Sequence, residues 1–241
     1  MSEIEGAGVA LHYTESGSGP PLLLIHGLAS DAEGWSDAAR SLATDGFRTI
    51  AYDRRGYGAS GAPDVYVATT VQEQAEDAAA LLGRLDALPA LLVGDGFGAL
   101  VALELLVRRP QLATAAVLSD PPLFAYVPAA TEALAEERKL LEDGLRAGGR
   151  AAALAVWMGE GADLSRAESW QRGFFADYAG QASWSPSRRE LRAIDVPVAL
   201  VTGPASAAHV VAAADAAAAL LPAASRTHDG DVVRAAVALG R

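Results

Sequence analysis

Residues 91–107, LLVGDGFGALVALELLV, decide the fold of this chain. Branched apolar residues end abruptly at Gly94, and an apolar pattern of helical period begins directly after Gly98. The stretch therefore predicts a buried strand, a very tight turn and a helix. Two architectures use such a turn. In one it is a nucleophile elbow, G-x-S-x-G, whose middle residue projects its side chain upward. In the other it is a dinucleotide-binding loop, G-x-G-x-x-G/A, whose glycines let the backbone approach a pyrophosphate.

The glycines alone fit both motifs. Gly94, Gly96 and Ala99 match the dinucleotide-binding string, and Asp120 lies near the position of its ribose-binding acid. Gly94 and Gly98 match the elbow, with glycine where the nucleophile should stand. The elbow is favoured because the turn sits in mid-chain, after two earlier strands whose flanking motifs have no role in dinucleotide binding.

Composition limits the kinds of partner. The chain has 241 residues, of which 51% are hydrophobic, enough for a substantial core in one large domain or two small ones. A net charge of −11 argues against nucleic acid and against an anionic membrane surface. The absence of cysteine removes disulfides, thiolate metal sites and cysteine nucleophiles, and no metal site is expected. No signal sequence and no run of about 18 apolar residues is present, so a cytoplasmic location is expected. Oligomeric state stays open.

Strands and helices alternate along most of the chain, which predicts a mostly parallel, doubly wound sheet. Residues 8–16 alternate apolar and polar side chains and predict a β-hairpin arm leading into the next strand. Further strands are expected at residues 22–25, 48–52, 113–118, 196–202 and 225–227, and helices at residues 36–45, 70–86, 205–221 and from 231 onward. Between the strands expected at residues 113–118 and 196–202, a segment of about seventy residues contains charged helical stretches and most of the aromatic residues.

Three further motifs accompany the turn: His26-Gly27 after an early strand, DRRGYGAS at residues 53–60, and a histidine near the C-terminus. Together with the turn at residues 94–98 they resemble the α/β-hydrolase superfamily, in particular its small esterase, lactonase and haloperoxidase-like members. The resemblance implies an α/β fold with a mostly parallel, doubly wound sheet and a helical cap inserted after the sixth strand. It also implies cofactor-independent chemistry. The expected division is a core at residues 1–121 and 191–241 and a cap at residues 122–190.

The chain departs from this family at the centre of the elbow. The family carries Ser or Asp there, whereas this chain carries Gly96, which has no side chain with which to attack a substrate. A covalent intermediate at this position is therefore impossible. A one-residue slip that made Asp95 the nucleophile would place Phe97 where the turn needs a small residue, which disfavours it.

The resemblance also supplies candidate catalytic residues. His228 follows the last strand, where the family's catalytic histidine resides. The family's acid usually stands where this chain has Ser206, but some members place it after the preceding strand, where Asp120 lies; it would fix the His228 tautomer. The backbone amides of Leu28 and Phe97 correspond to the oxyanion hole, in which each donor lowers a barrier by about 3 kcal/mol.

A substrate pocket is expected over the carboxyl edge of the sheet. His26, Trp157 and Phe174 are its candidate lining residues, although aromatics at helical spacing are as readily explained by core packing. Asp53 and Arg55 are expected to brace a loop rather than touch the substrate.

Three functions follow from these residues. The first is an enzyme that acts on a small apolar ester, lactone or enolisable ketone through non-covalent acid and base chemistry of His228, either by hydrolysis or as a lyase, isomerase or cyclase. The second is a catalytically inactive protein of the same fold that binds a small apolar ligand. The third is an ordinary serine esterase whose nucleophile has been replaced by Gly96.

Overall fold

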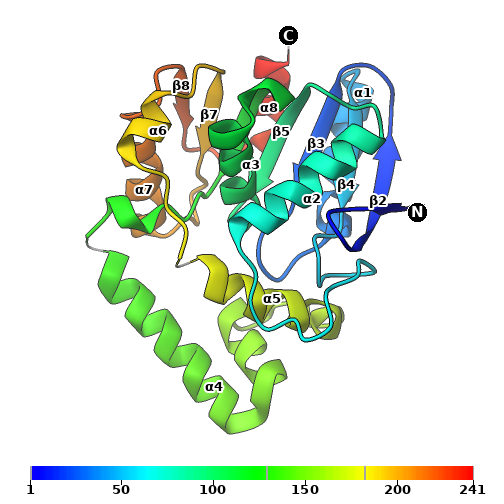
Figure 1. Ribbon diagram of the computed structural model, residues 1–241. Coiled ribbons are helices and arrows are strands. Elements are labelled where there is room, and N and C mark those ends of the chain that lie inside the picture. Colours follow the sequence, from blue (N-terminus) through cyan, green and yellow to red (C-terminus); the bar gives the residue numbers. More distant parts are fainter. Residues whose placement is uncertain (1, 129, 182, 241) are drawn as a thin grey trace.

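The computed structural model describes residues 2–128, 130–181 and 183–240, and these form a sheet covered by helices on both faces (Figure 1). Eight strands make up the described sheet in the order β1-β2-β4-β3-β5-β6-β7-β8. β2 pairs antiparallel with β1 and β4, and the other neighbours are parallel. The mostly parallel, doubly wound sheet is therefore confirmed. The strands are β1 Ser2–Glu5, β2 Ala10–Ser16, β3 Pro21–Ile25, β4 Arg48–Tyr52, β5 Ala90–Asp95, β6 Ala113–Ser119, β7 Val198–Val201 and β8 Ala224–Thr227.

The helices divide the core into two layers. α1 (Ser36–Thr44) and α8 (Val232–Leu239) pack on one face of the sheet. α2 (Val71–Arg84), α3 (Phe97–Arg108) and α7 (Ala208–Ala218) pack on the other. The continuously apolar strands predicted this arrangement, because only a sheet covered on both faces buries both rows of side chains.

Local signals explain where the helices begin. Thr70 and Glu73 form a capping box at the start of α2, in which each side chain accepts a hydrogen bond from the other residue's backbone. The Asp231 carboxylate caps α8 by accepting from the Arg234 amide at 2.8 Å. The predicted hairpin arm differs from the observed pairing. β2 pairs with β1 and β4, so the turn after Ser16 carries the chain across the sheet instead of closing a hairpin with β3.

Two long helices, α4 (Ala130–Met158) and α5 (Ala167–Gln181), form the cap that follows β6, and in Figure 1 they lie below the sheet. α4 is bent, because the backbone is not helical at Gly148 and Gly149. The two arms of the bent helix touch closely: a Cβ placed on Gly144 would lie 2.6 Å from Ala153 Cα. The chain returns to the core through α6 (Arg188–Arg192), whose capping box is formed by Ser187 and Glu190.

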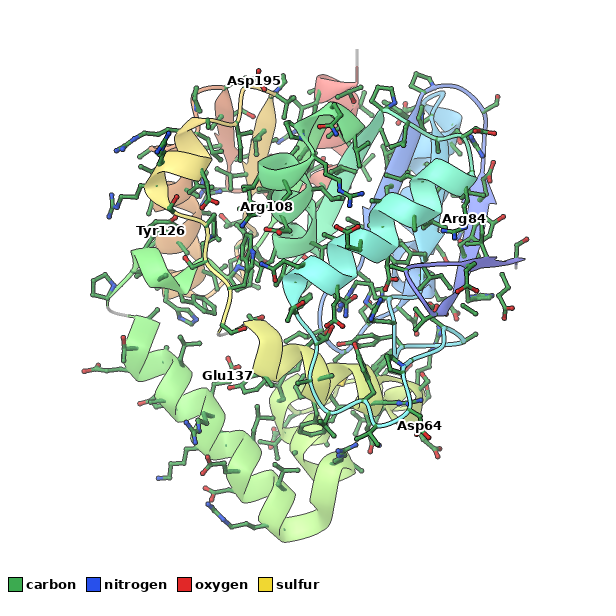
Figure 2. All side chains as sticks on the ribbon, viewed as in Figure 1. Asp64, Arg84, Arg108, Tyr126, Glu137 and Asp195 are labelled. Carbon is green, nitrogen blue, oxygen red and sulfur yellow. The ribbon has the colours of Figure 1, made fainter. Side chains whose placement is uncertain are left out.

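Side chains of the cap and of the core extend toward one another across the boundary between them (Figure 2). The short helices η1 (Ala32–Trp35), η2 (Pro110–Leu112) and η3 (Phe124–Tyr126) lie in the connections. Tyr126 belongs to the segment that leads from β6 into the cap, and Glu137 stands on α4 (Figure 2). None of the helices in the described residues is both long and apolar enough to cross a lipid bilayer.

Candidate active site

The turn between β5 and α3 has the geometry of an elbow. Gly96 has φ 50° and ψ −116°, in the left-handed half of conformational space, and its amide donates to the Ser119 carbonyl oxygen at 2.9 Å. A Cβ on Gly94 would overlap the Gly98 carbonyl, and one on Gly98 would overlap the Ile25 carbonyl. Both flanking glycines are therefore required by the close approach of strand and helix.

The apex of this elbow is Gly96 and not Asp95. A Cβ on Gly96 would meet only Gly27 Cα, at 3.8 Å, so a side chain there would project into open space. Asp95 is the last residue of β5, and its Oδ1 accepts a hydrogen bond from Ser119 Oγ at 2.8 Å. The geometry thus disfavours the one-residue slip, and the apex presents backbone alone.

The two predicted oxyanion-hole amides leave the sheet at the same level. β3 and β5 are parallel neighbours, and Ile25 pairs with Gly94. Leu28 and Phe97 each stand three residues after these partners, beyond the ends of β3 and β5. Phe97 is also the first residue of α3, where an amide has no partner within the helix and the helix dipole favours negative charge. The register thus places Leu28 and Phe97 beyond the ends of neighbouring strands.

The candidate acid and base have different partners. Asp120 Oδ1 accepts from Ser206 Oγ at 2.6 Å. The exposed His228 places Nδ1 3.4 Å from Thr202 Oγ1. No hydrogen bond joins Asp120 to His228 among the described residues. The structure thus brings Asp120 to the position of the usual family acid, Ser206, and leaves His228 beside β7.

The register of the sheet explains this separation. Asp95, Ser119, Val201 and Thr227 pair in a row across β5, β6, β7 and β8. Gly96 and His228 follow the first and last members of that row. Strands lie about 4.8 Å apart, so three spacings separate the two backbones by about 14 Å. In the structure the His228 ring contacts Thr202, which directly follows β7.

His26 is a buried bracing residue. It is 1% exposed, and its Nε2 accepts a hydrogen bond from the Arg54 amide at 3.0 Å. The proton therefore lies on Nδ1, which donates to the Gly27 carbonyl oxygen at 2.8 Å. Burial, with a smaller contribution from the Arg54 charge, lowers the pKa of His26 well below its ordinary value, so the ring is neutral. Both ring nitrogens are used within the protein, and His26 does not line the cavity under the cap.

The DRRGYGAS loop is held by its own charged residues. The Asp53 carboxylate accepts from the amides of Ala32 and Ala59, each at 2.9 Å. Arg55 donates to Asp77 on α2 through Nε at 2.5 Å and Nη2 at 2.9 Å. Asp53 and Arg55 thus have the bracing contacts expected of them.

Sequence reasoning missed the residue between them, Arg54. Its Nη1 lies 2.5 Å from Asp177 Oδ2 on α5, and both side chains are fully buried. Tyr57 Oη and Gln74 Nε2 also donate to this carboxylate, at 2.8 and 2.9 Å. The network connects the cap to the core. The one signal in the sequence is an acidic residue inside the otherwise apolar and aromatic run GFFADYAG.

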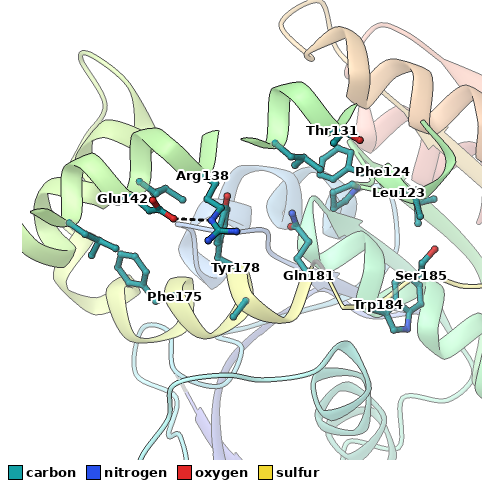
Figure 3. A pocket seen from close by; sticks show the side chains of 16 residues that line it. Leu123, Phe124, Thr131, Arg138, Glu142, Phe175, Tyr178, Gln181, Trp184 and Ser185 are labelled. Carbon is teal, nitrogen blue, oxygen red and sulfur yellow. Dashed lines mark hydrogen bonds and ion pairs between the residues drawn. The ribbon is translucent and has the colours of Figure 1, made fainter. Parts of the chain in front are cut away.

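A cavity of about 600 Å³ lies between cap and core (Figure 3). Most of its walls are apolar or aromatic, and they come from Leu123, Phe124, Leu134, Leu141, Phe175, Tyr178 and Trp184. Gln181 points into the space between Tyr178 and Phe124, and the ion pair of Arg138 and Glu142, at 2.9 Å, stands at one side (Figure 3). Burial raises the pKa of Tyr178 to about 12, so its hydroxyl stays protonated.

The predicted pocket aromatics lie elsewhere in the cap. Phe174 is fully buried, and Trp157 packs edge-on against it with a centroid distance of 5.0 Å. Phe175, which follows Phe174 on α5, and Tyr178, which stacks on Phe174 one turn later, line the cavity in their place. Among the described residues, no group of three or more histidine, aspartate or glutamate side chains is arranged to hold a metal ion.

Comparison with known proteins agrees with this architecture. Residues 20–183 match the family model of the alpha/beta hydrolase fold. An uncharacterised hydrolase of Bacillus subtilis is 32% identical over 117 residues, 48% of this chain and 43% of the relative. An epoxide hydrolase of Caballeronia sordidicola is 38% identical over 113 residues, 45% of this chain and 33% of the relative. The matched segments span less than half of either relative.

Among solved structures, an alpha/beta hydrolase from Sphaerobacter thermophilus superposes with a TM-score of 0.75 and 24% identity, with all of both chains covered. This likeness concerns the fold. Together with the family model, which covers more than half of the chain, it settles the classification: the chain belongs to the α/β-hydrolase fold family.

Proposed function

We propose that this protein binds a small apolar carbonyl compound, such as an ester, lactone or enolisable ketone, in the cavity under the cap without forming a covalent bond to it. The observation that carries the proposal is the elbow apex at Gly96, which has the backbone of a nucleophile position and no side chain. The candidate base and acid support the same conclusion, because His228 contacts Thr202 and Asp120 contacts Ser206.

The cavity supports the chemical class of the ligand. Ligand pockets combine mainly apolar and aromatic walls with a few polar groups that fix orientation. Here Phe124, Phe175 and Trp184 supply the apolar surface, and Gln181 supplies an amide that both donates and accepts. A volume of about 600 Å³ suits a molecule of one or two rings with a short chain.

A second candidate, non-covalent catalysis, is supported by the strand register that places Leu28 and Phe97, the proposed oxyanion-hole residues, beyond the ends of neighbouring strands. The hydrolase activity named for the curated relatives also supports it. In this proposal the loop after β8 moves toward β5, so that the imidazole of His228 leaves Thr202 and activates a water in the space above Gly96, or moves a proton on a bound ketone. Replacement of His228 by Ala then abolishes turnover. Turnover that persists unchanged in this variant excludes the second candidate.

The binding proposal is tested with two probes. Butyrophenone, which carries a carbonyl group and cannot be hydrolysed, reports binding by calorimetry, and 4-nitrophenyl butyrate reports turnover by release of nitrophenolate. Leu134→Trp places a large side chain in the cavity, whereas Leu140→Trp makes the same change on the exposed side of α4.

We expect saturable butyrophenone binding that weakens at least tenfold in Leu134→Trp and is unchanged in Leu140→Trp. No saturable nitrophenolate release is expected from the unmodified protein. Absence of butyrophenone binding, or equal binding by both variants, contradicts the binding proposal. Saturable nitrophenolate release that is lost in His228→Ala would favour the catalytic proposal over the binding proposal.

A further inference from the structure

A second, smaller cavity lies beside the elbow, on the α1 and α8 side of the sheet. Its volume is about 230 Å³, and it shares no lining residue with the cavity under the cap. The β3–α1 connection, the ends of β5 and β6 and the start of α8 enclose it. The lining residues that matter here are Gly27, Ser30, Trp35, Asp95, Ser119 and Val232.

The Asp95 carboxyl group offers a vacant acceptor to this cavity. Its Oδ1 accepts from Ser119 Oγ at 2.8 Å, but no described residue donates to its Oδ2. A Cβ placed on Gly27 would lie 2.9 Å from that oxygen, so glycine at this position keeps the space beside it free. This oxygen faces the cavity and can accept a hydrogen bond from a molecule bound there.

Trp35 offers the complementary group. Its indole nitrogen is buried and has no hydrogen-bond partner among the described residues. The other three tryptophans all have acceptors: Trp157 donates to Glu137, Trp170 to Asp31 and Trp184 to Glu104. A buried indole N–H without an acceptor is unusual, because tryptophan normally finds a partner for this group.

The two unsatisfied groups define the chemistry of an occupant. It must donate a hydrogen bond to Asp95 and accept one from Trp35, and a hydroxyl group does both. An ammonium group only donates, and a carboxylate only accepts and meets the negative charge of Asp95. Val232 and the indole ring provide an apolar surface for a short carbon chain.

We propose that this cavity is a binding site for a small alcohol, whose hydroxyl donates to Asp95 Oδ2 and accepts from the indole nitrogen of Trp35. The site is independent of ligand binding under the cap, because the two cavities have no lining residue in common. Ser119 fixes the Asp95 carboxyl group, and His26 takes no part in binding because both its ring nitrogens are already bonded within the protein.

The test uses three probes of equal length: 1-propanol, propylammonium and propionate. The indole N–H signals of the four tryptophans are followed by nitrogen–proton NMR at pH 7.5 and assigned by single Trp→Phe variants. We expect 1-propanol to shift the Trp35 signal saturably and downfield, with little change in the other three. Trp35→Phe and Asp95→Asn should each weaken 1-propanol binding at least fivefold, whereas Trp157→Phe, a matched change in the cap, should not.

Three outcomes overturn the proposal. One is a linear, unsaturable shift of all four indole signals, which indicates a general solvent effect. Another is tighter binding of propylammonium or propionate than of 1-propanol, which contradicts the hydroxyl assignment. The third is unchanged 1-propanol affinity in Trp35→Phe. The first two outcomes are observed on the unmodified protein, so they do not depend on the folding of any variant.

Discussion

Arg54 and Asp177 form a fully buried ion pair across the boundary between core and cap, with 2.5 Å between Nη1 and Oδ2. Arg54 follows β4, and Asp177 lies on α5, more than one hundred residues later. The guanidinium also lies over the rings of Tyr57 and Phe97, with centroid distances of 4.7 and 4.8 Å. The Arg54 side chain therefore packs against Phe97 at the start of α3 and also holds α5 through Asp177.

Removing one partner of this pair should destabilise the protein strongly. Asp177→Ala leaves the Arg54 charge buried without a counter-ion, and we expect the free energy of unfolding in urea to fall by about 3–5 kcal/mol. Asp37→Ala, which removes an exposed partner of Arg40, is the control and should change stability by about 0.5 kcal/mol or less. Equal effects of the two substitutions would show that the buried pair does not stabilise the structure.

The close contact of strand and helix at the elbow can be tested at Gly98. A methyl group there meets the carbonyl oxygens of Ile25 and His26, so we expect Gly98→Ala to lower the free energy of unfolding by about 3 kcal/mol. Gly83, on the exposed surface of α2, has no atom near its missing Cβ. Gly83→Ala should raise stability by about 0.5–1 kcal/mol. A neutral Gly98→Ala variant in urea unfolding would contradict the described turn.

A hydroxyl group at the apex should not by itself create an esterase. The side chain of Gly96→Ser has space, because the nearest atom to its Cβ is Gly27 Cα at 3.8 Å, although the φ of 50° strains any residue other than glycine; Gly96→Ala carries the same strain and is the matched control. The proposed binding function predicts less than a tenfold rise in kcat/KM for 4-nitrophenyl butyrate over Gly96→Ala, because His228 and Asp120 have other partners. A rise of three orders of magnitude would instead identify the protein as a serine esterase that lacks only its nucleophile.

The Asp95 carboxyl group should make stability depend on pH in the direction opposite to a salt-bridged carboxylate. Burial raises its pKa from 3.8 to about 6 in the folded protein. Between these values the folded state binds more protons than the unfolded state, so the Asp95 contribution falls as pH rises from about 4 to 6 and is constant above.

Asp95→Asn removes this contribution. The variant should gain about 1–2 kcal/mol over the parent at pH 7, after allowance for partial solvent screening, and little at pH 4. Urea unfolding of the two proteins from pH 4 to pH 7.5 tests this prediction, because it gives the difference between their free energies of unfolding at each pH. If the free energy of unfolding of Asp95→Asn exceeds that of the parent by the same amount at every pH, the pKa of Asp95 is not raised in the folded protein.

Much of the fold follows from local patterns in the sequence. Gly94 and Gly98 predict the elbow because the strand and helix approach too closely at these two positions for any side chain. Thr70 with Glu73, and Asp231, predict the starts of α2 and α8 because their side chains satisfy free amides at helix ends. β1 was not predicted, since Ser2–Glu5 is short, mostly exposed and carries no apolar pattern.

The candidate site is less predictable because its contacts are long-range. Asp120 and His228 both lie at the carboxyl edge of the sheet as expected from their positions after strands, but the sequence does not determine which neighbour each side chain reaches. Ser206 competes for Asp120, and Thr202 for His228. Arg54 finds its partner 123 residues away, and no periodicity links the two positions.

The bend of α4 limits the size of ligand that the cavity under the cap can hold. Gly144 lies directly against the backbone of Ala153, so the two arms of the helix meet without any side chain between them. The first arm of α4, which lines the cavity, is therefore held against the second arm by direct backbone contact, with the bend at Gly148 and Gly149. Smaller side chains on the first arm would enlarge the cavity locally. Its overall width depends on the backbone contact between the two arms, so a much bulkier ligand would require a different bend.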